Sequence, residues 1–270
     1  MSPIIINGVR FINKTTYAVC YIDDFSDDLK DIIRRQLSSI CHGASKASKS
    51  RKRYNYQNTV KSFLERYEKK TDKTKIGMIG ELLTHIFILQ FLTDFNTVSP
   101  FFNMEEKSIT KGFDIVMYSS STNELWITEV KSGELHQDKN SDETNKVLLG
   151  KAKADLKTRL NENAGTLWEN AINGATIVLE NITDTKDAVI AILDEIADEI
   201  SDDHAASTDK NVILVTSLFS NLKNEIQEQS IKNFSLSTKR EKIFKNILVL
   251  SIQKNTYEKV YKFLKEEAKS

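Results

Sequence analysis

Most of the chain alternates between segments with helical periodicity and short apolar runs. Two such runs, 115–118 and 125–130, flank the polar segment 119–123, which is the pattern of a β-hairpin. Two later runs, 212–218 and 246–252, are rich in β-branched residues and are typical of buried strands. This alternation predicts an α/β domain in which helices flank a central mixed β-sheet.

Four segments have the periodicity of helices that would cover such a sheet. Apolar residues surround segment 75–95 almost completely, which predicts a buried helix. A charged helix is expected over 146–163, with an extension towards residue 173 left open. Segment 189–200 combines an apolar stripe with many acidic residues, and segment 257–268 has the pattern of a final amphipathic helix.

Residues 1–72 are expected to form an N-terminal α+β extension, and residues 73–270 are expected to form the main domain. Short strands are predicted within residues 4–22, where Asn-Gly and Asn-Lys pairs give turn signals. Ser26 is a suitable N-cap for a helix over residues 27–40, whose first turn is acidic.

The chain has 38 lysines and arginines and 38 aspartates and glutamates, but the two signs are separated along it. The small and basic segment 43–50 is expected to be a linker or loop. Segment 46–75 is strongly basic with interleaved tyrosines, whereas 180–209 is strongly acidic and would repel DNA. The basic stretch could bind DNA through phosphates and stacked bases, face an acidic partner, or be solvated; the sequence leaves all three open.

The sequence has no pattern of an exported protein or of a zinc site. Cys20 and Cys41 form no CxxC motif and are expected to be reduced thiols. The first ten residues lack the basic and apolar regions of a signal peptide. Segment 76–92 is too short and too polar to span a bilayer. A cytoplasmic protein without membrane association is therefore expected.

The residues with catalytic potential lie on the predicted hairpin. Side chains alternate along a strand, so Glu129 and Lys131 share one face with the apolar residues that precede them. A strand that changes in this way leaves the core and enters a cleft. Asp114 opens the other arm of the hairpin and would lie beside Glu129 and Lys131 when the strands pair.

Asp114 and Glu129 predict a metal site, because two adjacent carboxylates repel each other unless a cation lies between them. Mg²⁺ is expected, with Mn²⁺ as a substitute, since Mg²⁺ prefers hard oxygen ligands and keeps several waters. The ion would neutralise a phosphodiester and activate a water that Lys131 orients or helps to deprotonate. Lys131 would also stabilise charge on the pentacovalent phosphate. Glu81, between apolar residues of the buried helix, is expected to complete the acidic cluster. The competing interpretation is a surface ion pair between Glu129 and Lys131.

Three motifs together resemble the PD-(D/E)xK nuclease superfamily, and they are Lys75-Ile76-Gly77-Met78-Ile79-Gly80-Glu81, Gly112-Phe113-Asp114 and Glu129-Val130-Lys131. Phe113 replaces the proline that gives the superfamily its name. The motifs are most similar to those of the HamA family, the nuclease subunits of the Hachiman antiphage defence system, and the resemblance covers mainly residues 73–135.

This resemblance implies a restriction-endonuclease-like core and a DNA endonuclease or nickase that works with a superfamily 2 helicase, HamB. It also implies a set of catalytic residues, which are Asp114, Glu129, Lys131 and Glu81. The metal ligands would be the three carboxylates and the backbone carbonyl of Val130. The alternative is a catalytically inactive nuclease-fold module that binds DNA or a helicase.

Several residues after the Glu-Val-Lys motif are candidates for substrate binding, and they are Ser132, His136, Lys151, Lys153 and Lys157. Ser132 could bind a phosphate or cap a turn. In the resembling fold the three lysines would line the substrate groove, although a solvated helix face is equally consistent. His85 lies one helical turn after Glu81 and either assists the metal or packs in the core.

Overall fold

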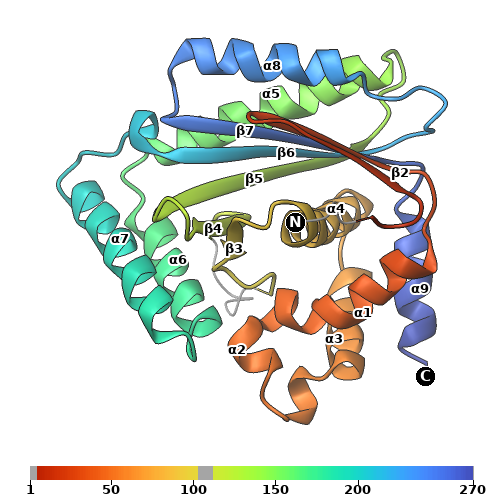
Figure 1. Cartoon of the computed structure of the whole chain (residues 1–270), viewed down its shortest axis with the longest axis horizontal. Helices are drawn as coiled ribbons and strands as arrows, with labels where there is room; N and C mark the ends of the chain where they lie inside the picture. The colour runs from red at the N-terminus through yellow and green to blue at the C-terminus, as the bar shows by residue number, and fades with distance from the viewer. Residues whose placement is uncertain (1–4, 103–111, 270) are drawn as a thin grey trace.

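The computed structural model describes residues 5–102 and 112–269, which form a seven-stranded sheet flanked by helices (Figure 1). The strands are β1 (Val9–Asn13), β2 (Tyr17–Ile22), β3 (Phe95–Thr97), β4 (Ile115–Ser119), β5 (Glu124–Glu134), β6 (Asn211–Phe219) and β7 (Asn246–Lys254). The helices are α1 (Asp27–His42), α2 (Ala44–Ala47), α3 (Tyr56–Glu68), α4 (Asp72–Phe91), α5 (Ser141–Leu160), α6 (Gly165–Val178), α7 (Thr183–Ser201), α8 (Glu228–Glu241) and α9 (Glu258–Glu267), with 3-10 turns η1 (Lys52–Tyr54) and η2 (Ser207–Asp209).

The sheet is mixed, and its strand order is β1-β2-β7-β6-β5-β4-β3. Strands β2, β7, β6 and β5 run parallel, while β1, β4 and β3 pair antiparallel with their neighbours. The predicted hairpin is formed by β4 and β5, and its turn contains Asn123 with a φ of 55°, a left-handed conformation that asparagine tolerates. The α/β class with a mixed, helix-flanked sheet is therefore confirmed.

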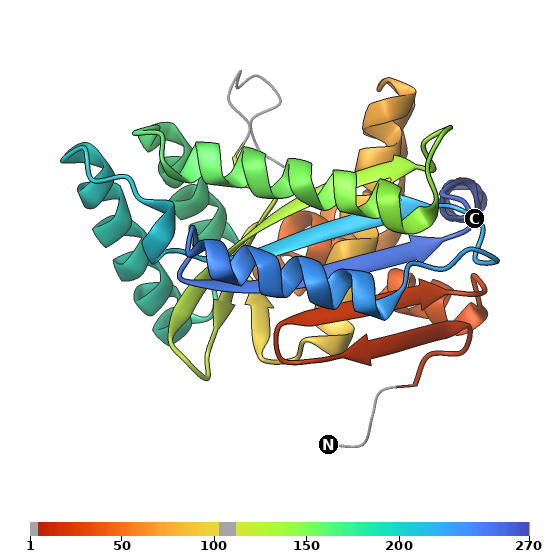
Figure 2. The same ribbon diagram turned by 90° about the horizontal axis from the view of Figure 1, so that it is seen from above.

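Helices cover both faces of this sheet. Figure 2 shows α5 and α8 side by side on one face, and Figure 1 shows α4, α1 and α9 on the other. Helices α6 and α7 pack against each other beside β4 and β5. The expected buried helix is α4, which Thr71 caps. In the two described parts of the chain, no helix is long and apolar enough to cross a membrane.

The N-terminal strands belong to the same sheet as the rest of the chain. β2 pairs with β7 over its whole length, from Tyr17 beside Val249 to Ile22 beside Lys254. The predicted N-cap of α1 is confirmed, because Ser26 Oγ accepts the N–H of Leu29 at 3.3 Å. The expected domain boundary after residue 72 falls at the start of α4, and the sheet contains strands from both sides of it.

Segment 43–50 is more ordered than the expected linker. It contains the short helix α2, in which Ser45 is buried and its hydroxyl donates to the carbonyl of Val178 at 2.8 Å. Gly43 has a φ of 84°, and a Cβ at this position would lie 2.8 Å from Cα of Val178. The small residues of this segment therefore serve close packing against α6 rather than flexibility.

The single helix expected over 146–163 also differs from the structure. α5 begins at Ser141, where Asn140 and Glu143 form a capping box, and it ends at Leu160. Asn161 is the C-cap of α5, and its side chain exchanges hydrogen bonds with Ser207 where the chain leaves the helix. The predicted extension towards residue 173 is therefore a separate helix, α6.

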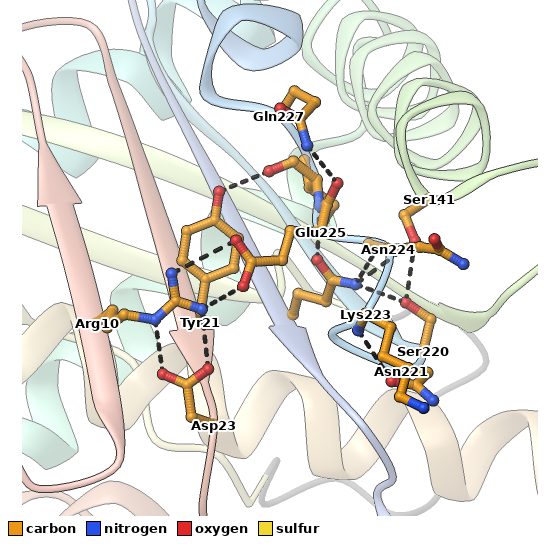
Figure 3. Close-up of polar contacts among 12 residues, drawn as sticks. Arg10, Tyr21, Asp23, Ser141, Ser220, Asn221, Lys223, Asn224, Glu225 and Gln227 are labelled. Atoms are coloured by element: carbon orange, nitrogen blue, oxygen red, sulfur yellow. Dashed lines mark hydrogen bonds and ion pairs between the residues drawn. The ribbon is translucent and has the colours of Figure 1, made fainter.

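A polar network holds the loop after β6 against the first two strands (Figure 3). Arg10 forms ion pairs with Asp23 (Nε to Oδ2, 2.6 Å) and with Glu225 (Nη2 to Oε1, 2.5 Å). Its guanidinium carbon lies 4.5 Å from the ring centre of Tyr21. The Tyr21 hydroxyl donates to the carbonyl of Ile226 at 2.5 Å. These contacts fix the chain that leads into α8.

The same loop depends on Gln253, which is fully buried. Its side chain accepts the Ile226 N–H at 2.7 Å and donates to Ser220 Oγ and the Asn224 carbonyl at 2.8 and 2.9 Å. Gln253→Leu should lower the free energy of unfolding by about 3 kcal/mol in urea denaturation, since it removes the partner of several buried polar groups. Gln229→Leu, exposed on α8, is the control, and equal losses in both variants would contradict this role.

Candidate active site at the end of the β4–β5 hairpin

Asp114, Glu129 and Lys131 lie together where the β4–β5 hairpin ends. Asp114 immediately precedes β4, and the register of β4 against β5 places it opposite Glu129. Its Oδ2 accepts the N–H of Val130 at 2.8 Å. The Nζ of Lys131 lies 2.6 Å from Oε1 of Glu129. The structure thus brings together two carboxylates and one ammonium group from the two arms of the hairpin.

The alternation along β5 carries these side chains from the core to the surface. Leu125 and Ile127 precede them on the same face and pack in the apolar cluster that includes residues of α5 and α6. Glu129 is 2% exposed, whereas the side chain of Lys131 is 27% exposed. The carboxylate is therefore shielded from water, and the ammonium group has access to solvent.

Two residues of α5 that sequence reasoning missed complete this cluster. Arg159 Nη1 lies 2.8 Å from Oε2 of Glu129, and Nη2 donates to the carbonyl of Gly112 at 2.6 Å. Asp155 Oδ2 lies 2.8 Å from Nζ of Lys131. Asp155 and Arg159 are four residues apart, so they share one helix face. That spacing is visible in the sequence, but it does not indicate which strand the face covers.

Burial and the neighbouring charges of the cluster shift the pKa values of Glu129 and Lys131. Burial and the neighbouring charge of Asp114 raise the pKa of Glu129, and Arg159 and Lys131 oppose part of this rise. Burial disfavours the charged form of Lys131, but the surrounding carboxylates outweigh it and raise the pKa of Lys131. Lys131 is therefore a cation at neutral pH.

The similarity of this chain to a known protein family extends over nearly its whole length. The sequence profile of HamA matches residues 6–268. This chain belongs to the HamA family. The match confirms the predicted resemblance to the HamA family. No match was found among curated proteins or solved structures. Membership in the HamA family supports a role as a component of Hachiman antiphage defence and suggests a nuclease-like protein.

Glu81 does not join the cluster in this HamA-family chain. Gly80 packs against β5, and a Cβ added to it would lie 2.7 Å from Cβ of Ser132. Because Ser132 and Lys131 are adjacent and point to opposite faces of β5, α4 covers the face away from Lys131. Burial and, to a smaller extent, the charge of Glu81 raise the pKa of Cys41 in α1.

His85 lies on the same side of the sheet as Glu81 and is part of the core. It is 1% exposed, and its ring is edge-on to Phe101 with ring centres 5.8 Å apart. Burial lowers the pKa of His85 to about 3, so the ring is neutral. The sequence left open whether His85 assists the metal or packs in the core, and the structure places it in the core.

The candidates for substrate binding are dispersed around the hairpin end. Ser132 faces α4, and Lys153 forms an ion pair with Glu241 of α8 at 2.8 Å, so both are turned away from the cluster. His136 is half-buried in the turn between β5 and α5. The HamA-family chain therefore presents neither Ser132 nor Lys153 to a phosphate beside Lys131.

Lys151 and Lys157 are both exposed on α5, but they differ in direction. Lys151 lies one turn before Asp155 and shares its helix face, which borders the cluster. Lys157 is two residues after Asp155 and points to another side of the helix. Of the two lysines, Lys151 is therefore the one on the helix face that borders the candidate site.

The hairpin end offers a ligand set that suits a hard divalent cation. Asp114 and Glu129 supply carboxylates on one face of the strand pair. The Val130 N–H points to Asp114, and its carbonyl faces the same side because both groups of a strand residue face one neighbour. In the described ranges, no three His, Cys, Asp or Glu side chains could hold a metal. A metal would thus depend on two carboxylates and one carbonyl, all oxygen ligands.

Proposed function

We propose that this chain is a metal-dependent DNA nuclease of the PD-(D/E)xK type, an endonuclease or nickase that acts in the cytoplasm as the partner of the helicase HamB. The observation that carries this proposal is the meeting of Asp114, Glu129 and Lys131 at one end of the hairpin. Family membership supports the defence role and the helicase partner.

Asp114, Glu129 and the carbonyl of Val130 would hold Mg²⁺, with Mn²⁺ as a substitute. When bound, the ion would neutralise charge on the scissile phosphate and make a bound water more acidic. Burial is the main cause of the raised pKa of Glu129, and the nearby charge of Asp114 adds to it. A cation between the two carboxylates would relieve this second contribution.

Lys131 would act as a fixed cation rather than as a base. Without a metal, the neighbouring carboxylates raise the pKa of Lys131 and so favour the protonated form of Nζ. A protonated Nζ can donate hydrogen bonds to the negative charge that develops on the phosphate. Of the two roles expected from the sequence, this favours charge stabilisation over deprotonation.

Arg159 would position the two carboxylate-bearing strands. It contacts Glu129 on β5 and the carbonyl of Gly112 just before β4, so one guanidinium spans both sides of the proposed metal site. Its planar fork suits such a bidentate arrangement.

A second candidate function is a nuclease-fold module that binds DNA or a helicase without cutting. The charges around Glu129 favour it, because Lys131 and Arg159 already lie 2.6 and 2.8 Å from its two oxygens. Such a carboxylate is neutralised by the protein's own cations. This module would tolerate the loss of Asp114 without a change in DNA binding.

The two candidates differ in a cleavage assay with the chain bound to its helicase partner. Wild-type complex is expected to cut DNA with Mg²⁺ and to stop in EDTA. Asp114→Asn keeps the side-chain size and an acceptor for the Val130 N–H, and should slow cleavage at least about a hundredfold, since it removes a charged metal ligand. Asp138→Asn, exposed before α5, is the control. Undiminished cleavage by Asp114→Asn, or no wild-type cleavage with either metal, would refute the nuclease proposal.

A further inference from the structure

A basic pocket lies near the carboxyl end of α6, away from the candidate site. Its volume is about 850 Å³, and five cationic residues line it together with Tyr54, namely Lys46, Lys49, Arg51, Lys52 and Arg53. Its described lining also contains one acid, Glu180, which pairs with Lys49 at 2.7 Å. The pocket therefore carries a strong positive charge in a protein whose formal net charge is zero.

The pocket stands on a packed support rather than on a free loop. Ser45, within the same segment, donates to the carbonyl of Val178 at 2.8 Å and accepts the N–H of Asn181 at 3.1 Å. Gly43 packs directly against Val178. These contacts fasten α2 to the end of α6, so the cations that follow in the sequence are held in place beside it.

Tyr54 gives the pocket an aromatic surface among its cations. The guanidinium carbon of Arg53 lies 4.6 Å from the ring centre, and the Nζ of Lys46 lies 5.9 Å from it. The ring is half-buried. Cations that follow a phosphate backbone, combined with an aromatic ring, are the features with which proteins bind nucleic acid strands without reading their sequence.

Helix α6 connects this pocket to the candidate active site. Near its start, Trp168 contacts Phe113, the residue before Asp114, with ring centres 4.9 Å apart. At its end, Val178 contacts the pocket segment. These two positions on α6 are about 15 Å apart along the helix axis at the usual rise per residue. That length corresponds to roughly four or five base pairs of duplex DNA.

We propose that the basic pocket binds backbone phosphates of the same nucleic acid that enters the candidate active site. This inference rests on the proposed function, since it extends the substrate from Asp114 along α6 to the pocket. The acidic helix α7 packs against α6.

Equilibrium binding without a metal tests the pocket independently of cleavage. The full chain would be titrated, in EDTA, against a fluorescent DNA duplex of about 30 base pairs at several salt concentrations. The test variant combines Arg51→Ser, Lys52→Ser and Arg53→Ser, whose side chains are exposed. The control combines Lys232→Ser, Lys239→Ser and Arg240→Ser, which are exposed on α8 and remove the same net charge.

The pocket variant should bind the duplex at least about tenfold more weakly, and its salt dependence should fall by about two to three ion equivalents. The control should bind as the wild type does. Wild-type affinity in the pocket variant, equal losses in both variants, or no DNA binding by the wild type would overturn the inference. If the pocket variant bound DNA with wild-type affinity but no longer bound the helicase partner, the pocket would instead be assigned to an acidic protein surface.

Because EDTA prevents cleavage, failure of the two proposals can be told apart. Pocket-dependent binding by a chain that cuts no DNA would retain the pocket as a nucleic acid site and reject the nuclease. Cleavage that persists while the pocket variant binds DNA normally would retain the nuclease and reject the pocket.

Discussion

Lys131→Met is expected to lower the rate of DNA cleavage at least about a hundredfold at saturating Mg²⁺, because it removes a positive charge aimed at the reacting phosphate. Methionine keeps the unbranched shape of the side chain, so β5 should retain its packing. The readout is the single-turnover cleavage rate of the chain bound to its helicase partner, with the melting temperature measured in parallel to confirm folding.

Lys157→Met is the matched control, since Lys157 is exposed on α5 and points away from the cluster. It should cut at the wild-type rate. The pH profile separates the two possible roles of Lys131. Deprotonation of a metal-bound water raises the rate with pH in any case, so the profiles of the wild type and Lys131→Met are compared. A rise that Lys131→Met lacks would assign a base, and parallel profiles would assign a cation. Wild-type cleavage by Lys131→Met would refute the role of this residue.

Gly80→Ala should lower the free energy of unfolding by about 2–3 kcal/mol, although alanine is the better helix former. The reason is the close approach of α4 to the sheet. A Cβ on Gly80 would lie 2.7 Å from Cβ of Ser132 and 2.9 Å from Cβ of Ser217. Urea denaturation measures the loss.

Gly77→Ala is the control in the same helix, because a Cβ at Gly77 meets no atom within 4 Å. This variant should gain up to about 1 kcal/mol from helix propensity. Adding Ser132→Gly to Gly80→Ala should recover part of the stability, since it removes one of the two clashing side chains. If Gly80→Ala proved as stable as Gly77→Ala, the close contact between α4 and β5 would be wrong.

The sequence predicts Asp114, Glu129 and Lys131 as a cluster because their arrangement depends on local rules. A hairpin pairs its two arms, and alternation along β5 places Glu129 and Lys131 on one face. Neither step requires knowledge of a distant contact. The same holds for the N-cap at Ser26 and for the parallel strands β6 and β7, whose continuous apolar runs are themselves diagnostic.

The prediction for Glu81 shows where local rules end. A buried acid on an apolar helix suggests a functional role, but the sequence does not state which face of the sheet the helix covers. The contact of Gly80 with Ser132 places α4 on the face of β5 away from Lys131. Within the described residues, no three His, Cys, Asp or Glu side chains gather to hold a metal. Asp155 and Arg159 were missed for the complementary reason, because their meeting with Lys131 and Glu129 depends on how α5 crosses β5.

The position of β2 in the sheet has a consequence for how the molecule is made. β2 is synthesised before β6 and β7, yet its parallel neighbour is β7, which spans Asn246–Lys254. Until β7 exists, β2 and β6 lack the strand that lies between them, and one edge of each remains unpaired. Contacts of such long sequence separation slow folding. The central sheet therefore closes only after β7 has been translated, and a product truncated before β7 cannot assemble it.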